Sequence, residues 1–136
     1  MQVRTSTSVI IIALLLVACG STANWKGYSP VEAETLQAMG ISASEANHYR
    51  DMGFTSGTIQ HWYDAGFRRK DDITAWHDAG FPADEAGNWR GNDFSLKAAY
   101  EWRKKNFSAK EAHGWQKKGF ELKEAEKLRN KGLSAD

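Results

Sequence analysis

Histidine is the residue type in this chain that comes nearest to forming a reactive site, because its positions are regular. His48 and His61 occupy the same place in two adjacent sequence repeats, and His77 lies two positions later in its own repeat. Asp51 and Asp64 stand nearby and add carboxylates. A protein zinc site needs three or four converging ligands, whereas this pattern aligns only two imidazoles. The spacing therefore favours histidines on the surface of a repeat over a metal centre.

No other arrangement of residues indicates catalysis. The sequence contains no serine–histidine–aspartate order, no glycine-rich phosphate loop and no His-Glu-x-x-His motif. Asp71 and Asp72 are interpreted as a loop pair in a charged insertion rather than as an acid–base dyad. The single cysteine excludes an intramolecular disulfide and a cysteine-rich zinc site. We therefore predict a non-catalytic protein without metal or cofactor, and metal bound to the purified protein would revive the enzyme hypothesis.

These residues belong to a sequence unit that recurs about eight times between Tyr28 and Leu133. An apolar column with a spacing of 13 residues, apart from one interval of 14, consists of Tyr28, Ile41, Phe54, Phe67, Phe81, Phe94, Phe107, Phe120 and Leu133. The residue before each is glycine, asparagine or aspartate, the types that enter the left-handed conformation most readily. This second column predicts a helix end in every unit.

A new helix is predicted to start directly after each helix end. The position after the apolar residue carries an N-cap residue type in five units, at Ser29, Ser42, Thr55, Ser95 and Ser108. A glutamate three residues after Ser29, Ser42 and Ser108 completes a capping box. In a Schellman helix end the apolar residue also packs on the residue five positions earlier, which pairs Phe107 with Trp102. One aromatic ring thus closes one helix and opens the next.

The predicted fold is all-α, an array of about eight helices of roughly ten residues each. Its units are residues 29–40, 42–53, 55–66, 68–80, 82–93, 95–106, 108–119 and 121–132. Such short helices persist only when packed on their neighbours, either as a solenoid or curled into a compact domain. We expect the middle to be the softest region, because Gly57 lies in the first turn of the third unit and Gly87 and Gly91 interrupt the fifth.

A tryptophan column could have a function of its own. It consists of Leu36, Tyr49, Trp62, Trp76, Trp89, Trp102, Trp115 and Leu128. A row of indoles could stack sugar rings or bases. Each member stands five residues before the apolar residue that closes its helix, where it would be covered. The column is therefore predicted to be core.

The N-terminal residues carry a different signal. An apolar run, Val9 to Val17, follows Arg4 and is too short to span a bilayer as a helix. It ends in Leu16-Val17-Ala18-Cys19, which resembles the lipobox of bacterial lipoproteins. The resemblance implies that residues 1–18 are a signal peptide that is removed. Cys19 would then carry a diacylglycerol and an amide-linked acyl chain such as palmitate.

This resemblance also implies a location. Gly20 in place of aspartate resembles the signal for outer-membrane sorting, so we expect export and lipid anchoring, with the outer membrane favoured over the inner where the source has one. The alternative is an ordinary signal peptide cleaved near Ala23, with an incidental Cys19. Residues 19–27 would form the lipidated cysteine and a short linker, and residues 28–136 the repeat domain. Trp25 either rests in the membrane interface or begins the array.

Charge is balanced overall, with 18 basic and 17 acidic residues, but it is segregated along the chain. Residues 32–89 hold ten acids and four bases, whereas residues 90–136 hold seven acids and twelve bases. Several lysines fall in the last turns of predicted helices, where a cation favours the helix dipole, and this explains most of the pattern. The alternative is a basic face for anionic lipid, cell-wall polymer or an acidic partner.

These features predict a membrane-anchored envelope lipoprotein whose repeats bind or scaffold a protein partner. The predicted partner face consists of exposed helix positions, the first four in one column: Arg90, Arg103, Gln116, Arg129, Lys104 and Lys117. The alternative is a binder of envelope polymer or anionic lipid that uses the basic C-terminal repeats, and sensitivity to salt separates the two. Nucleic acid is excluded as a partner, because an exported protein does not normally meet DNA and the front half is acidic.

Overall fold

The computed structural model describes residues 24–136, and this part of the chain contains eight α-helices and no strand. The helices are α1 (Pro30–Ala38), α2 (Ala43–Asp51), α3 (Ser56–Asp64), α4 (Lys70–Asp78), α5 (Ala83–Gly91), α6 (Leu96–Lys104), α7 (Ala109–Lys117) and α8 (Leu122–Arg129). This confirms the predicted array of short helices. None of the helices in the described part is long and apolar enough to cross a membrane.

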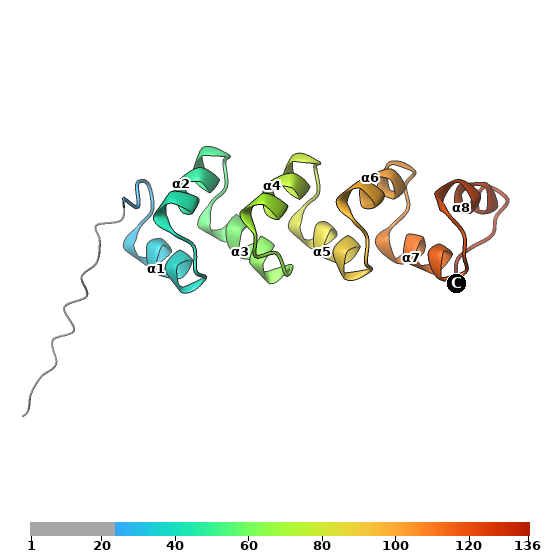
Figure 1. Ribbon diagram of the computed structural model, residues 1–136, viewed down its shortest axis with the longest axis horizontal. Helices are drawn as coiled ribbons and strands as arrows, with labels where there is room; N and C mark the ends of the chain where they lie inside the picture. The colour runs from blue at the N-terminus through green and yellow to red at the C-terminus, as the bar shows by residue number, and fades with distance from the viewer. Residues whose placement is uncertain (1–23) are drawn as a thin grey trace, which may run out of the picture.

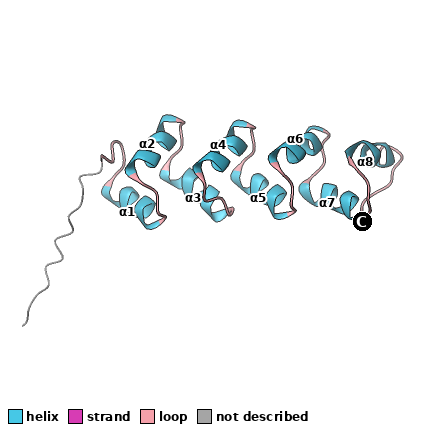
Figure 2. Ribbon diagram, in the orientation of Figure 1, coloured by secondary structure: helices cyan, strands magenta, loops and turns pink. Residues whose placement is uncertain are grey.

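Successive helices alternate between two rows, which gives an elongated solenoid (Figure 1). The odd-numbered helices form one row, in which α3 contacts α1 and α5, and α5 contacts α7. The even-numbered helices form the other row, and short loops connect the two (Figure 2). The structural repeat is therefore two sequence units. Of the two shapes that the sequence left open, the extended solenoid is correct.

Each helix ends where the sequence predicts, through a left-handed residue. Asn106 has φ 59°, and its N–H donates to the Arg103 carbonyl at 2.8 Å. The N–H of Phe107 donates to the Trp102 carbonyl at 3.1 Å, which completes the Schellman motif. Asp93 takes the same conformation with φ 65°. The column of glycine, asparagine and aspartate is thus a column of helix stops.

Aromatic rings link the two rows into one continuous core. The Phe67 ring contacts Trp62 behind it, with centroids 5.0 Å apart, and Trp76 ahead of it at 5.9 Å. Both contacts are edge-to-face, a favoured geometry for aromatic pairs. Trp62, Trp76 and Trp89 are all buried. The tryptophan column is core, as predicted, and one phenylalanine closes one helix and opens the next.

Two of the units expected to be weak contain compensating contacts. In α3, Thr58 closes a capping box with Thr55, the N-cap residue, although a threonine takes the place of the usual glutamate. In α5, a Cβ on Gly87 would lie 3.1 Å from the carbonyl oxygen of Ala65 at the end of α3. Gly87 therefore permits close packing of two odd-row helices. It is not simply a flaw in α5, because its missing side chain has a packing role.

The array begins earlier than the sequence indicated. Trp25 packs edge-on against Tyr28, with ring centroids 6.2 Å apart, and the Asn47 side chain donates to the Asn24 carbonyl at 2.8 Å. Residues 24–27 thus belong to the array, and of the two roles considered for Trp25 the structure supports the start of the array. The lipobox at Leu16-Val17-Ala18-Cys19 lies outside the described residues.

Candidate binding surfaces

The predicted partner face lies in both rows of the structure. Arg90 and Gln116 lie on α5 and α7 in the odd row, whereas Arg103 and Arg129 lie on α6 and α8 in the even row. Residues one sequence unit apart fall in opposite rows, because successive helices alternate between the two. The four residues share one position of the sequence repeat, but the structure distributes them over both rows, and their use as a partner face stays a prediction. The face divides into two, with a spacing of two units in each.

Arg103 has a structural role that its position in the sequence repeat does not reveal. Its guanidinium lies over the Phe81 ring, with Cζ 4.5 Å from the ring centroid, and donates to the Gly80 carbonyl at 2.9 Å. Its Nε also pairs with a Glu85 carboxylate oxygen at 2.8 Å. Gly80 is the left-handed residue that follows α4. Arg103 therefore joins α6 to the end of the preceding even-row helix and to α5.

Arg129 and Arg90 make related contacts. The Arg129 guanidinium donates to the Asn106 carbonyl at 2.9 Å and lies over Phe107, with Cζ 3.6 Å from the ring centroid. Arg90 lies over Phe67 at 4.6 Å, and its Nη1 is 4.0 Å from a carboxylate oxygen of Asp72. These arginines stabilise the stacking of successive units. Their use in binding a partner stays a prediction.

Gln116, Lys104 and Lys117 are exposed, and their side chains form no hydrogen bond or ion pair with residues 24–136. Lys104 and Lys117 are the last residues of α6 and α7, where a cation favours the helix dipole. By contrast, the neighbouring Lys105 pairs with Glu126 at 3.0 Å. Of the six predicted contact residues, these three are the ones whose side chains stand out from the array without such a partner.

The acidic residues singled out from the sequence lie apart from one another. Asp71 and Asp72 occupy the first turn of α4 rather than a loop, because the insertion is taken up before α4 begins. Carboxylates favour that end of a helix. Asp51 pairs with Arg50 at 3.6 Å, and Asp64 accepts a hydrogen bond from Gln60. In residues 24–136, no three His, Cys, Asp or Glu side chains converge.

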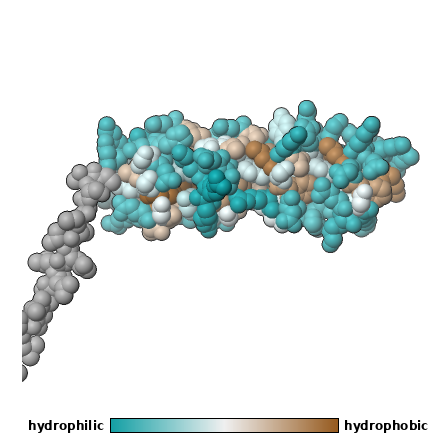
Figure 3. All heavy atoms as spheres, in the orientation of Figure 1, coloured by the Kyte–Doolittle hydropathy of each residue, from teal (hydrophilic) through white to brown (hydrophobic). Residues whose placement is uncertain are grey.

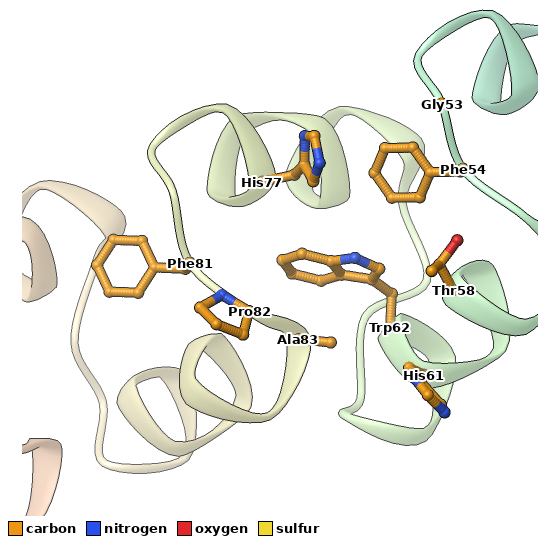
Figure 4. Close-up of a pocket in the computed structure, with 9 residues that line it drawn as sticks. All are labelled: Gly53, Phe54, Thr58, His61, Trp62, His77, Phe81, Pro82 and Ala83. Atoms are coloured by element: carbon orange, nitrogen blue, oxygen red, sulfur yellow. The ribbon is translucent and has the colours of Figure 1, made fainter.

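Two of the histidines, however, share a pocket. His61 on α3 and His77 on α4 line an open hollow of about 210 Å³, whereas His48 is exposed on α2, away from it. In Figure 4 the Trp62 indole lies at the centre, with Phe54 and Phe81 toward opposite ends. The imidazole of His77 packs on Phe54, with ring centroids 4.5 Å apart.

The remaining walls of this pocket come from Gly53, Thr58, Pro82 and Ala83. They belong to the second, third and fifth sequence units, so no local motif could have signalled them. Pro82 is the N-cap residue of α5 and offers no side-chain acceptor to the helix. The walls combine aromatic rings with the Thr58 hydroxyl, two imidazoles and backbone carbonyls. This arrangement suits a small group that is flat and polar at its edge.

The solenoid keeps the charge difference along its axis. The acidic stretch 32–89 spans α1 to most of α5, and the basic stretch 90–136 contains α6 to α8. Figure 3 shows a face on which hydrophilic residues predominate and apolar residues form small separate patches. The large apolar side chains that are exposed in the described part are Val31, Tyr100 and Leu133. The two ends of the array therefore differ in charge.

No protein-family model matches this chain, and neither does any curated protein or solved structure. Its function must therefore be argued from its own surfaces and from the N-terminal sequence.

Proposed function

We propose that this protein is a lipid-anchored component of the bacterial envelope whose helical array holds a protein partner. The observation that carries the proposal is the elongated array, in which eight short helices form two rows. Repeat arrays of this kind create extended surfaces suited to binding partners. The protein then acts by binding and positioning rather than by catalysis.

The anchor supplies the location. The sequence Leu16-Val17-Ala18-Cys19 supports lipidation at Cys19, and several acyl chains give the stable membrane attachment that one chain does not. Only four residues lie between Cys19 and Asn24, where the array makes its first described contact. The five steps from Cys19 to Asn24 reach at most about 18 Å, so the array lies close to the membrane that holds it. Gly20 favours the outer membrane.

Crosslinking in living cells tests both parts of this proposal. The native protein is compared with the Cys19→Ala variant, and both are fed a fatty-acid analogue that reports acylation. We expect the native protein to incorporate the analogue and to crosslink to a defined envelope protein, and Cys19→Ala to lose both. Acylation that persists in Cys19→Ala would contradict the anchor. Native protein that crosslinks to no protein would contradict the binding role.

A second candidate function rests on the basic helices α6 to α8. Lys104 and Lys117, the last residues of α6 and α7, have no ionic partner in residues 24–136. Residues 90–136 contain twelve basic and seven acidic residues. Such a surface would hold anionic lipid headgroups or an anionic envelope polymer. Binding of that kind weakens steeply as ionic strength rises, whereas a packed protein interface is far less sensitive.

Charge reversal separates this candidate from the first. Lys104→Glu with Lys117→Glu should weaken sedimentation of the protein with vesicles of anionic lipid, most strongly at low salt. Lys70→Glu, at the start of α4 in the acidic half, is the matched control and should have little effect. Equal binding by all three proteins would remove the second candidate.

A further inference from the structure

The four even-row helices share a contact that indicates which chemical group the pocket could bind. In each, the residue after the tryptophan column covers the aromatic ring that opens the preceding odd-row unit. The pairs and their separations, from Cζ or from the imidazole centroid to the covered ring, are Arg50 over Tyr28 at 5.8 Å, His77 over Phe54 at 4.5 Å, Arg103 over Phe81 at 4.5 Å and Arg129 over Phe107 at 3.6 Å. Only the α3–α4 pair uses histidine.

The same pair differs at a second position. The third residue of the odd-row helices is Glu32 in α1, Thr58 in α3, Glu85 in α5 and Glu111 in α7. In α5 this glutamate forms an ion pair with Arg103. In α3 and α4 both long side chains are replaced by shorter ones. The pocket lined by Thr58 and His77 lies where the other pairs hold a glutamate and an arginine (Figure 4).

The other pairs also show which atoms a guanidinium meets there. Arg103 and Arg129 each donate to the carbonyl of the left-handed residue before the covered ring, Gly80 or Asn106. The counterpart in the pocket is Gly53, which has φ 86° and lines the wall. The Gly53 carbonyl accepts no hydrogen bond from residues 24–136. The acceptor that is used in the α5–α6 and α7–α8 pairs is therefore open in α3–α4. In α1–α2, Arg50 covers its ring without such a hydrogen bond to residues 24–136.

We propose that the pocket takes the arginine side chain of a partner protein, whose guanidinium lies beside His77 and donates to the Gly53 carbonyl as Arg103 donates to the Gly80 carbonyl in the next pair. A planar guanidinium stacks on aromatic faces, and Phe54, Trp62 and Phe81 line the pocket. Its N–H groups meet the Gly53 carbonyl. The surrounding stretch 32–89, with ten acids and four bases, attracts a cation. This inference names the partner chemistry of the proposed binding function and rests on it.

A small probe tests the pocket directly. The full-length protein in detergent is titrated with arginine blocked at both ends, N-acetyl-arginine methylamide, and the four histidine side chains are followed by NMR. We expect the signals of His61 and His77 to move, and those of His48 and His113 to stay. The citrulline analogue has the same shape without the charge and should bind at least tenfold more weakly. Equal binding of the two probes, or no movement at His61 and His77, would overturn the proposal.

Three variants localise the site. His77→Arg supplies the guanidinium from within the chain and should weaken the probe at least tenfold. His48→Arg makes the same change outside the pocket and should leave binding within twofold. His77→Ala leaves the carbonyl and the rings in place and should retain binding within fivefold. Undiminished binding to His77→Arg, or loss in His77→Ala equal to that in His77→Arg, would refute the assignment, and a thermal melt checks that each variant is folded.

This result and the result for the proposed function can fail separately. Lack of a crosslinked partner in cells would leave probe binding by the purified protein unaffected, and would refute the envelope role. If the arginine probe does not bind but crosslinks to a partner persist, the arginine site alone is refuted. That outcome would place the partner on another part of the array.

Discussion

The α3–α4 and α5–α6 pairs share one backbone plan but differ in how their surface is closed. In α5–α6, Arg103 joins the Gly80 carbonyl, the Phe81 ring and Glu85. In α3–α4, His77 covers its ring but reaches no equivalent carbonyl, and an open pocket lies beside it. The pair α5–α6 is therefore held by a brace, meaning the contacts of Arg103 with Gly80, Phe81 and Glu85. In α3–α4 the corresponding residues are His77 and Thr58, and the brace is absent.

The core beneath is the same in both pairs. Trp62 meets Phe67 with ring centroids 5.0 Å apart and planes at 84°, and Trp89 meets Phe94 at 5.0 Å and 87°. The aromatic and glycine columns thus fix the fold, whereas the residue after the tryptophan is exchangeable. An array built in this way can acquire a binding site in one pair without disturbing its neighbours, because each unit depends mainly on adjacent contacts.

The largest expected effect comes from removing the core ring of each pair. Trp89→Ala should lower the free energy of unfolding by about 3–5 kcal/mol, since it removes a buried indole that also donates to Glu85. Trp62→Ala should cost about 1 kcal/mol less, because the Trp62 indole forms no such hydrogen bond with residues 24–136 and lines the open pocket. Urea denaturation followed by circular dichroism measures both. Equal losses would show that the pocket does not weaken its pair.

The parts of this molecule that the sequence predicted are those set by local contacts. The Phe107–Trp102 contact and the left-handed Asn106 lie within six residues of each other, so spacing and residue type sufficed. The two rows were not predicted, because they depend on contacts such as Arg103 with Gly80, which are 23 residues apart. The pocket was missed for a related reason. It exists because Thr58 and His77 are shorter than the glutamate and arginine at the same positions of α5–α6, and no sequence motif marks a shorter side chain.

Removing the brace should have the next largest effect. Arg103→Met keeps much of the apolar stem but loses the hydrogen bond to Gly80, the contact of the guanidinium with Phe81 and the ion pair with Glu85. Because the side chain is half-exposed, we expect a loss of about 1–2 kcal/mol. Lys97→Met on the same helix, which removes an exposed cation, should change stability by less than about 0.5 kcal/mol. Similar losses in the two variants would argue against a bracing role.

Rebuilding the brace in the open pair is the converse experiment. Thr58→Glu combined with His77→Arg restores both residue types found in α5–α6, and Thr55 followed by glutamate still forms a capping box. We expect the double variant to gain about 1 kcal/mol, and more than the sum of its single variants. A double-mutant cycle measured by urea denaturation gives this coupling. A coupling of zero would mean that the pocket is not an unfilled brace site.

Two glycines of α5 sharpen the comparison further, because only one of them contacts α3. A Cβ at Gly91 would meet nothing within 4 Å, so Gly91→Ala should stabilise the protein by about 0.5–1 kcal/mol. A Cβ at Gly87 would press on the Ala65 carbonyl at 3.1 Å and force α3 and α5 apart. Gly87→Ala should therefore give no gain in the midpoint of thermal unfolding. An equal gain at both sites would show that this close approach is unimportant.

The smallest expected effect concerns the capping boxes, which use Thr58 in α3 but Glu111 in α7. Hydrogen bonds from the backbone N–H and then the hydroxyl of Ser108 hold the pKa of Glu111 below its ordinary value of 4.5. The stability that this carboxylate contributes is present above that value and is lost as the pH falls through the lowered pKa. The Thr58 hydroxyl has no such titration.

Hydrogen exchange in α7 should accelerate in acid by an amount equivalent to roughly a few tenths of a kcal/mol, since the site is exposed. Glu111→Gln should abolish this acid dependence, and Thr58→Glu should create it in α3. Unchanged exchange of α3 in acid after Thr58→Glu would mean that a glutamate cannot form the box there, and the α3–α4 pair would then differ from its neighbours in backbone as well as in side chains.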